Sequence, residues 1–125
     1  MKIQIKSFLP AIGGLVFATL LFCLPGDEIP DAGWLDDLQL DKVVHIGLFT
    51  MLVFLWCLPM QSRFHEKRQL NKAHLWVALA FAAYGIVIEF IQRDFIPYRS
   101  FDFFDIVADV VGCVIGWIAA RKLAD

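Results

Sequence analysis

The chain has 125 residues, of which 59% are hydrophobic and 19% are charged, and its net charge is −2. Soluble domains average about 45–50% apolar and about 25% charged residues, whereas here the charges gather in short blocks between long apolar runs. This pattern is typical of an integral membrane protein, and no basic arm or patch in the sequence indicates a nucleic-acid partner.

Four apolar runs follow one another along the chain, at residues 8–24, 43–60, 75–91 and 103–120. Each has 17 or 18 residues. As helices that rise 1.5 Å per residue they would be about 25–27 Å long, close to the thickness of about 30 Å of a hydrocarbon core. We therefore predict an all-α membrane protein, a four-transmembrane-helix bundle that forms a single domain over residues 1–125.

The first run has features of both a signal peptide and a retained helix. Lys2 and Lys6 precede it, as basic residues precede a secretory signal, but it is longer than a usual signal core and no A-x-A cleavage pattern follows it. Pro10 falls in its first turn, where a missing N–H group costs little. We expect a retained helix.

The Lys and Arg residues predict the orientation. Because cytoplasmic loops of membrane proteins are rich in these residues, the basic segments should share the cytoplasmic side. Both termini and the middle loop would then be cytoplasmic, and residues 25–42 and 92–102 would form the outward loops. The eight basic residues assigned to the cytoplasmic side are Lys2, Lys6, Arg63, Lys67, Arg68, Lys72, Arg121 and Lys122.

Polar residues interrupt the second and third runs near their outward ends. Asp41 is placed to cap the second helix, and His45 lies on the same face one turn deeper. Glu89 and Gln92 share one face of the third helix with Gly85, where a glycine allows a neighbouring helix to come close. Ionisable side chains at such depths usually face the protein interior and have partners.

The fourth run begins with acidic residues and continues with glycines. Asp102 is predicted as the N-cap, and Asp105 three residues later completes a pattern that resembles a capping box. Asp105, Asp109, Gly112 and Gly116 are spaced by four, three and four residues, which forms one stripe along the helix. The Gly112-x-x-x-Gly116 pattern is typical of close helix packing, so this stripe should face the other helices.

The predicted topology brings these residues to one depth in the outer third of the bundle. Five acids then face three basic residues, and with a neutral His45 the cluster has an excess of two negative charges. A partly dry site needs a protonated acid, a charged histidine or a cationic ligand group to balance that excess. The members are Asp41, Lys42, His45, Glu89, Gln92, Arg93, Arg99, Asp102, Asp105 and Asp109.

These motifs resemble the VanZ-like family. The resemblance covers residues 41–116 and rests on Asp41-Lys42-x-x-His45, Glu89-x-x-Gln92, Arg99-Ser100-x-Asp102-x-x-Asp105 and the glycine-rich last helix. It implies a multi-pass protein of the bacterial cytoplasmic (inner) membrane. The founding member is associated with reduced susceptibility to the lipophilic glycopeptide teicoplanin, but the resemblance does not transfer that phenotype to this chain.

Three interpretations of the cluster follow from the sequence. It could bind a lipid headgroup, a lipid-linked envelope intermediate or a lipophilic glycopeptide, with Lys42, Arg93 and Arg99 on phosphate or carboxylate groups. It could instead be a polar network that locks the helices of an accessory subunit, or a His–carboxylate enzyme site. The predicted ligand-binding residues are Asp41, Lys42, His45, Glu89, Gln92, Arg99, Asp102, Asp105 and Asp109.

The expected partners follow from these interpretations. Membrane lipids surround the bundle, and an amphiphilic envelope ligand would occupy the cluster. The sequence leaves open whether the protein forms a homo-oligomer or joins a larger membrane complex. We assign no catalytic residue, no metal ligand and no cofactor.

Overall fold

A computed structural model describes residues 5–24, 40–97 and 102–124, and the side chains of all of these except residues 5, 6, 40 and 41. Every regular element in this part of the chain is helical. The elements are the 3₁₀ turn η1 (Ile5–Phe8) and the helices α1 (Leu9–Phe22), α3 (Leu40–Cys57), α4 (Met60–Arg63), α5 (Lys67–Phe95) and α6 (Phe103–Ala124).

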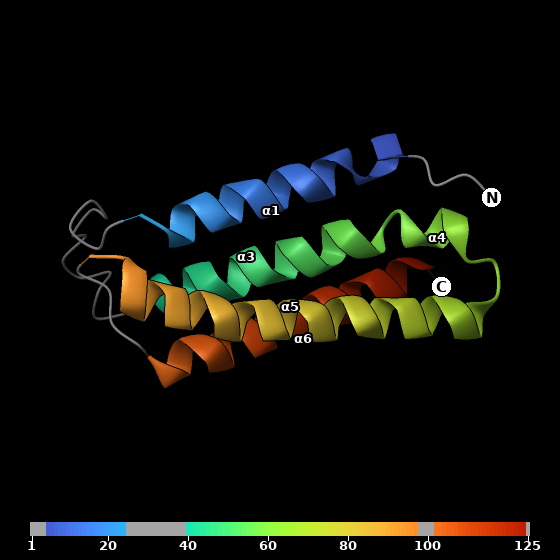
Figure 1. Cartoon of the computed structure of the whole chain (residues 1–125). Coiled ribbons are helices and arrows are strands. Elements are labelled where there is room, and N and C mark those ends of the chain that lie inside the picture. Colours follow the sequence, from blue (N-terminus) through green and yellow to red (C-terminus); the bar gives the residue numbers. More distant parts are fainter. Residues whose placement is uncertain (1–4, 25–39, 98–101, 125) are drawn as a thin grey trace.

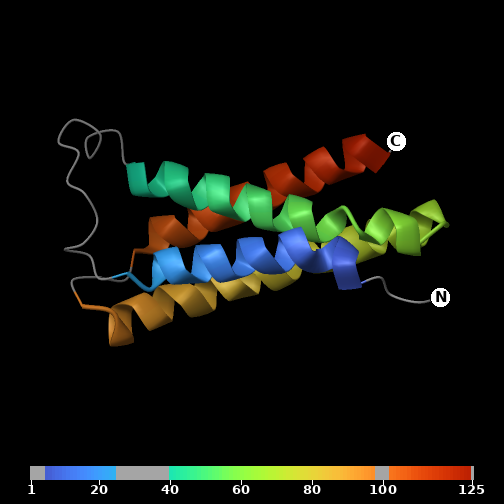
Figure 2. The same cartoon turned by 90° about the horizontal axis from the view of Figure 1, so that it is seen from above.

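The helices lie side by side in an elongated bundle, as two perpendicular views show (Figures 1 and 2). The beginning of α1, the short α4, the beginning of α5 and the end of α6 lie at one end, which we call the basic end because Arg63, Lys67, Arg68, Lys72, Arg121 and Lys122 belong to these segments. The opposite end holds the last turn of α1 and α5 and the first turn of α3 and α6. We call it the acidic end, after the carboxyl groups described below.

Three helical segments are long and apolar enough to cross a membrane: Lys42–Arg63, Lys67–Phe95 and Phe103–Ala124. The predicted apolar runs are thus confirmed as helices, although their bounds differ. α5 is 29 residues long and so extends about 43 Å, because the polar residues before Ala73 continue the helix beyond its apolar part. α1 is apolar but has only 14 residues, and Pro10 lies in its first turn as predicted.

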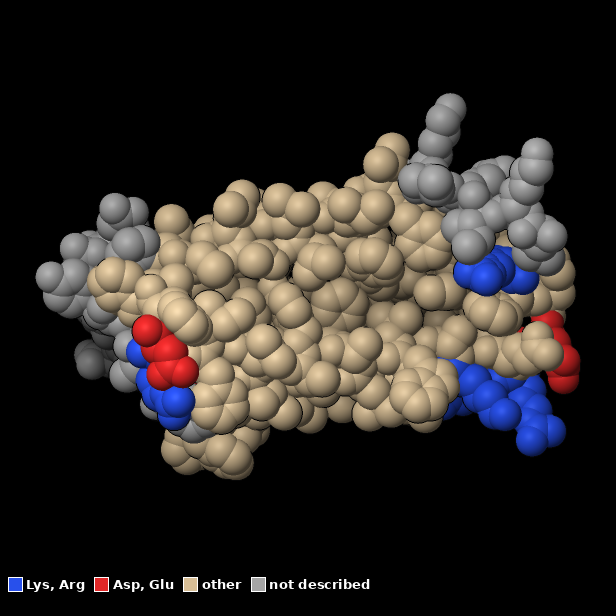
Figure 3. All heavy atoms as spheres, in the orientation of Figure 1, with Lys and Arg blue, Asp and Glu red and all other residues tan. Residues whose placement is uncertain are grey.

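The surface between the two ends is apolar. On the face shown in Figure 3 the charged atoms lie at the two ends, and the wide band between them has none. Large hydrophobic side chains point outward in this band, such as Leu20 and Trp76, which are 64% and 70% exposed. So much exposed apolar surface is unfavourable in water and is expected where helices contact lipid.

Glycines allow α6 to pack directly against the backbone of α3. A Cβ atom on Gly112 would lie 2.6 Å from the carbonyl oxygen of Ile46, and one on Gly116 would lie 2.7 Å from that of Thr50. The Thr50 hydroxyl donates to the carbonyl oxygen of Ile46 at 2.7 Å and to that of Gly112 at 3.2 Å. The predicted stripe on the last helix therefore faces a neighbouring helix, and this contact sets the distance between α3 and α6.

α1 is held at both of its ends. Just before its start, the ring of Phe8 lies 5.7 Å from that of Trp56. Phe22 is buried, and its ring lies 5.8 Å from that of Phe49 in α3 and 5.0 Å from the imidazole of His45. The Thr19 and Tyr84 hydroxyls form a hydrogen bond between α1 and α5. These contacts position α1 beside the polar residues of α3 and α5.

Candidate functional site

Lys42, in the first turn of α3, joins that helix to the start of α6. Its ammonium group donates to Oδ2 of Asp102 and to Oδ1 of Asp105, each at 2.6 Å. The Lys42 side chain is 16% exposed and that of Asp105 11%, so this is a largely dry pairing, whereas Asp102 is 39% exposed. The ammonium group beside Asp102 holds the pKa of that carboxyl below its usual value.

Asp102 also caps α6, as predicted. Its Oδ1 accepts a hydrogen bond from the backbone N–H of Phe104 at 2.9 Å, which satisfies one of the free donors at the helix start. The capping-box prediction for Asp105 is wrong, because the backbone N–H of Asp102 donates instead to Oε1 of Glu89 at 2.9 Å. A side chain of α5 thus completes the cap of α6, while Asp105 is bound to Lys42.

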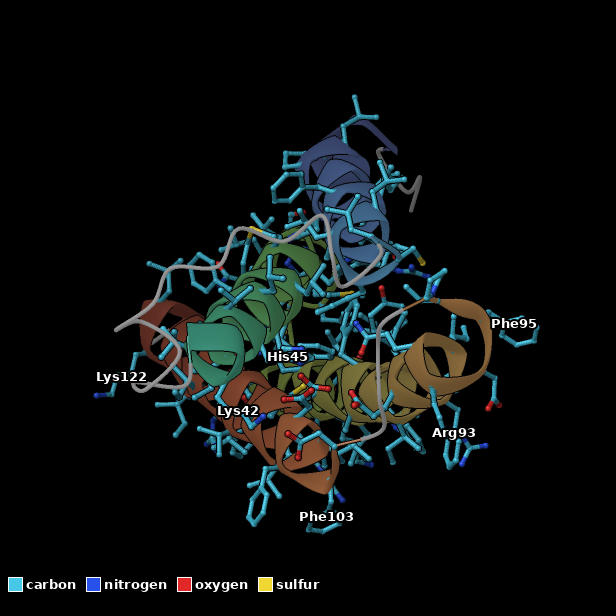
Figure 4. The ribbon with its side chains drawn as sticks, turned by 90° about the vertical axis from the view of Figure 1, so that its left-hand side faces the viewer. Lys42, His45, Arg93, Phe95, Phe103 and Lys122 are labelled. Carbon is cyan, nitrogen blue, oxygen red and sulfur yellow. The ribbon has the colours of Figure 1, made fainter. Side chains whose placement is uncertain are left out.

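His45 lies one turn deeper in α3 and contacts α6. Its Nδ1 and Oδ1 of Asp109 are 2.6 Å apart and form a buried hydrogen bond, and its Nε2 is 3.9 Å from Oδ2 of Asp105. A view from the acidic end shows Lys42 and His45 pointing into the space between α3, α5 and α6 (Figure 4). The hydrogen bond and the ion pair recorded for His45 among the described residues are thus both with carboxyl groups of α6.

Two carboxyl oxygens in this cluster are buried and have no hydrogen-bond partner among the described residues. They are Oε2 of Glu89 and Oδ2 of Asp109, and the two residues are 0% and 1% exposed. Gly85 makes room for the second of them, because a Cβ atom there would lie 2.7 Å from Oδ2 of Asp109. A buried acceptor without a donor is costly, so these oxygens are the unusual feature of the site.

The described part of the cluster has one lysine and four carboxyl groups. Among the described residues, Lys42 pairs with two of these groups, His45 with a third, and Glu89 accepts only a backbone hydrogen bond. The acidic excess that the sequence indicated is therefore present between α3, α5 and α6. No group of three or more His, Cys, Asp or Glu residues in the described ranges is arranged to hold a metal ion.

Gln92 and Arg93 were also predicted to belong to the cluster, but their side chains point elsewhere. Gln92 is buried on the face that Glu89 occupies, but its amide donates to the carbonyl oxygen of Phe22 at 2.9 Å and so connects α5 to α1. Arg93 points away from the bundle (Figure 4), where it pairs with Asp94 at 2.8 Å. The expectation that Arg93 contributes to the site is wrong, since it follows the buried face of α5 by one position.

The last two predicted members have no described side chain. Asp41 lies inside the first turn of α3, which begins at Leu40, so it does not precede the helix as the N-cap prediction required. Its side chain and the whole of Arg99 lie outside the described residues. Their assignment to the site stays a prediction.

Three polar residues that the sequence analysis did not single out bind neighbouring helices. Thr50 connects α3 to α6, and Thr19 and Tyr84 connect α1 to α5. Each interrupts an apolar run, so the signal that identified His45 and Asp109 was present in weaker form. Hydroxyl groups are common on either face of a membrane helix, because they can also bond to their own backbone.

This geometry defines an integral membrane protein with a buried, net acidic polar cluster between three helices near one membrane face. A family model described as VanZ/LLP1 matches residues 8–124, and the chain belongs to this family. It is 37% identical over 75 residues to an uncharacterized protein of the fission yeast Schizosaccharomyces pombe. That match covers 58% of this chain and 41% of the yeast protein. No solved structure matches the chain.

Proposed function

We propose that this protein is located in the cytoplasmic membrane of a bacterium, where its acidic end binds the polar part of an amphiphilic ligand from the outer side. The observation that carries this proposal is the pair of buried oxygens on Glu89 and Asp109 that have no hydrogen-bond partner among the described residues. Leaving a buried acceptor without a donor costs about 1–3 kcal/mol, and more if it is charged. A ligand that donates hydrogen bonds to these oxygens would remove that cost.

The chemistry of the cluster favours an ammonium or hydroxyl group as the part of the ligand that enters it. Lys42 is already held between two carboxyl groups, and Arg93 points away from the cluster, so neither supports recognition of a phosphate at this depth. The remaining carboxyl groups accept hydrogen bonds and attract positive charge. Asp41 and Arg99 remain predicted members of the ligand site, with Arg99 on the phosphate of the same headgroup.

A membrane lipid with a primary ammonium group, such as phosphatidylethanolamine, fits these requirements best. The outer surface beside the cluster is apolar and could contact the acyl chains: Phe103 points outward at the start of α6 (Figure 4), and Phe104 is 67% exposed. The yeast relative supports a lipid headgroup over a glycopeptide or a bacterial envelope intermediate, because a ligand common to both proteins has to occur in both membranes.

The competing proposal is a structural lock, with the protein as an accessory subunit of a larger membrane complex. It is favoured by the hydrogen bonds of the cluster, since those of Lys42, His45 and Glu89 each join two different helices. A lock explains these bonds but leaves Glu89 Oε2 and Asp109 Oδ2 unexplained. The two proposals therefore differ in what they predict for these two oxygens.

The test compares two lipids that differ only in their ammonium group. The purified protein would be placed in nanodiscs of phosphatidylethanolamine or of phosphatidylcholine with the same acyl chains, because the methylated ammonium of choline donates no N–H hydrogen bond. We expect a higher melting temperature in phosphatidylethanolamine, and bound phosphatidylethanolamine in native mass spectrometry. Glu89→Gln and Asp109→Asn should lower both signals while the variants remain folded.

Asp94→Asn is the matched control, since Asp94 is an exposed carboxylate at the same end of the bundle, paired with Arg93 outside the cluster. It should keep the full preference for phosphatidylethanolamine. Equal melting temperatures in the two lipids, or an equal loss in all three variants, would contradict the ligand proposal and leave the structural lock.

The orientation needs a separate test. We propose that the basic end is cytoplasmic, because basic residues at that end outnumber those at the acidic end. A reporter enzyme fused after Asp125 should read as cytoplasmic, and one inserted near Asp31 should read as external. The opposite pattern would move the proposed ligand site to the cytoplasmic face.

A further inference from the structure

The basic end carries a second feature that the proposed function does not use. An open groove of about 220 Å³ is lined by Trp117, Ile118, Arg121 and Lys122 of α6. The guanidinium group of Arg121 lies 5.0 Å from the centre of the Trp117 ring, which is the geometry of a cation–π contact. The indole N–H of Trp117 is buried and has no hydrogen-bond acceptor among the described residues.

The apolar wall of the groove continues along the surface of α6. Ile118 is 44% exposed, and Ile115 and Val114 are exposed in the turn before it. This line of side chains begins beside Arg121 and Lys122 and leads toward the middle of the membrane-spanning segment. Positive charge at the membrane surface therefore lies directly above an apolar strip that reaches into the hydrocarbon.

We infer that this groove binds one anionic phospholipid, such as phosphatidylglycerol. Arg121 and Lys122 would contact the phosphate, the Trp117 ring would hold the Arg121 guanidinium group in place, and an acyl chain would lie along Ile118 and Ile115. Charge complementarity favours this occupant, because the described lining of the groove has two cationic side chains and no carboxylate. Lys122 points away from the bundle in Figure 4.

This site is distinct from a general attraction of basic loops to anionic membranes. Arg68 and Lys72 are exposed on α5 at the same end and do not line the groove. A non-specific surface potential would depend on all of these charges alike, whereas a built site depends on the two that border Trp117. The two pairs therefore provide a matched comparison with the same change in net charge.

The experiment measures how much phosphatidylglycerol raises the melting temperature of the full-length protein in phosphatidylcholine nanodiscs. We expect a clear rise for the natural chain, loss of most of that rise in the double variant Arg121→Gln and Lys122→Gln, and retention in Arg68→Gln with Lys72→Gln. Trp117→Leu removes the aromatic ring that holds the Arg121 guanidinium group, and it should lose part of the rise. Each variant is compared with itself in pure phosphatidylcholine, so a change in its intrinsic stability does not affect the result.

Inorganic phosphate at matched concentration distinguishes a lipid from a free anion, and it should give no rise. Three results would overturn the inference: no effect of phosphatidylglycerol on the natural chain, equal losses in the two double variants, or a full effect of inorganic phosphate. Loss in the Arg121 and Lys122 double variant but not in the Arg68 and Lys72 double variant, with partial loss in Trp117→Leu, would establish the site. Neither outcome depends on the ligand proposed for the acidic end.

Discussion

Charged side chains are buried at one end of the bundle and exposed at the other. At the acidic end Glu89, Asp105 and Asp109 are buried between helices and fixed by partners on other helices. At the basic end Arg68, Lys72 and Lys122 are exposed on the outer surfaces of their helices. Basic side chains can orient a membrane protein from its surface, whereas buried carboxyl groups require a specific three-dimensional arrangement of partners.

The largest effect is expected from a substitution that prevents α3 and α6 from packing closely. Gly112→Leu would place a side chain against the backbone of Ile46, which cannot move without separating α3 from α6. We expect a loss of more than about 3 kcal/mol, at or above the usual range for overpacking, and a large fall in melting temperature in detergent. Val114→Leu on the exposed face should be mild, and similar results for both variants would show that the stripe is misassigned.

A smaller loss is expected when the cation of the acidic end is removed. Lys42→Met keeps the length of the side chain but leaves Asp102 and Asp105 without their shared partner. We expect destabilisation by about 3 kcal/mol, the lower end of the range for broken buried pairs, because Asp102 is partly exposed. Chemical unfolding would measure it, and adding Asp105→Asn should recover part of the loss. No recovery would mean that the pairing is not what stabilises this end.

Acid should weaken the acidic end through Asp102. The pKa of this carboxyl is lowered in the folded protein by the Lys42 ammonium group, so its ionised form contributes stability above the pKa of an unfolded aspartate, about 3.9. That contribution is lost as the pH falls below about 4 and passes through the lowered pKa. Between pH 6 and 3 the melting temperature should fall more steeply for the natural chain than for Asp102→Asn, which keeps the cap, so that the difference between the two shrinks in acid. Parallel curves would contradict the pairing.

The smallest effect is expected at the hydrogen bond between α3 and α6 below the cluster. Thr50→Val removes the hydroxyl that donates to Gly112 and keeps the shape of the side chain. Hydrogen bonds between membrane helices contribute about 0.6 kcal/mol on average, so a loss of this size is expected in an unfolding assay. Thr50→Ser should retain most of it. A loss as large as that for Lys42→Met would contradict this order and mean that the Thr50 bond contributes as much as the ion pairs of the cluster.

Much of the fold could be predicted because membrane insertion depends on the hydrophobicity of short, continuous stretches of sequence. Long apolar runs predicted the helices, and the spacing of Asp105, Asp109 and Gly112 predicted a buried stripe that the structure confirms. The ends of helices were less predictable. The helix α5 begins well before its apolar run, since helix formation by residues such as Lys67 requires no apolar environment.

The site could be predicted in its members but not in its pairing. Glu89 was recognised as a buried acid, yet nothing in the sequence indicated that it would accept the backbone N–H of Asp102. Gln92 was placed on the correct face and still bonds to α1. Such pairings depend on the rotation of each helix and on side-chain rotamers, and a difference of one position, as for Arg93, turns a side chain from the interior to the surface.

The order of the helices along the chain also bears on how the protein enters its membrane. The helix α6 carries Asp105 and Asp109, and an ionised acid deep in an isolated helix costs about 2.5–3.5 kcal/mol on insertion scales. Its partners Lys42, His45 and Glu89 belong to segments that are synthesised earlier. When ribosomes deliver the chain from its first residue to its last, the partners of these acids are therefore synthesised before α6 is inserted.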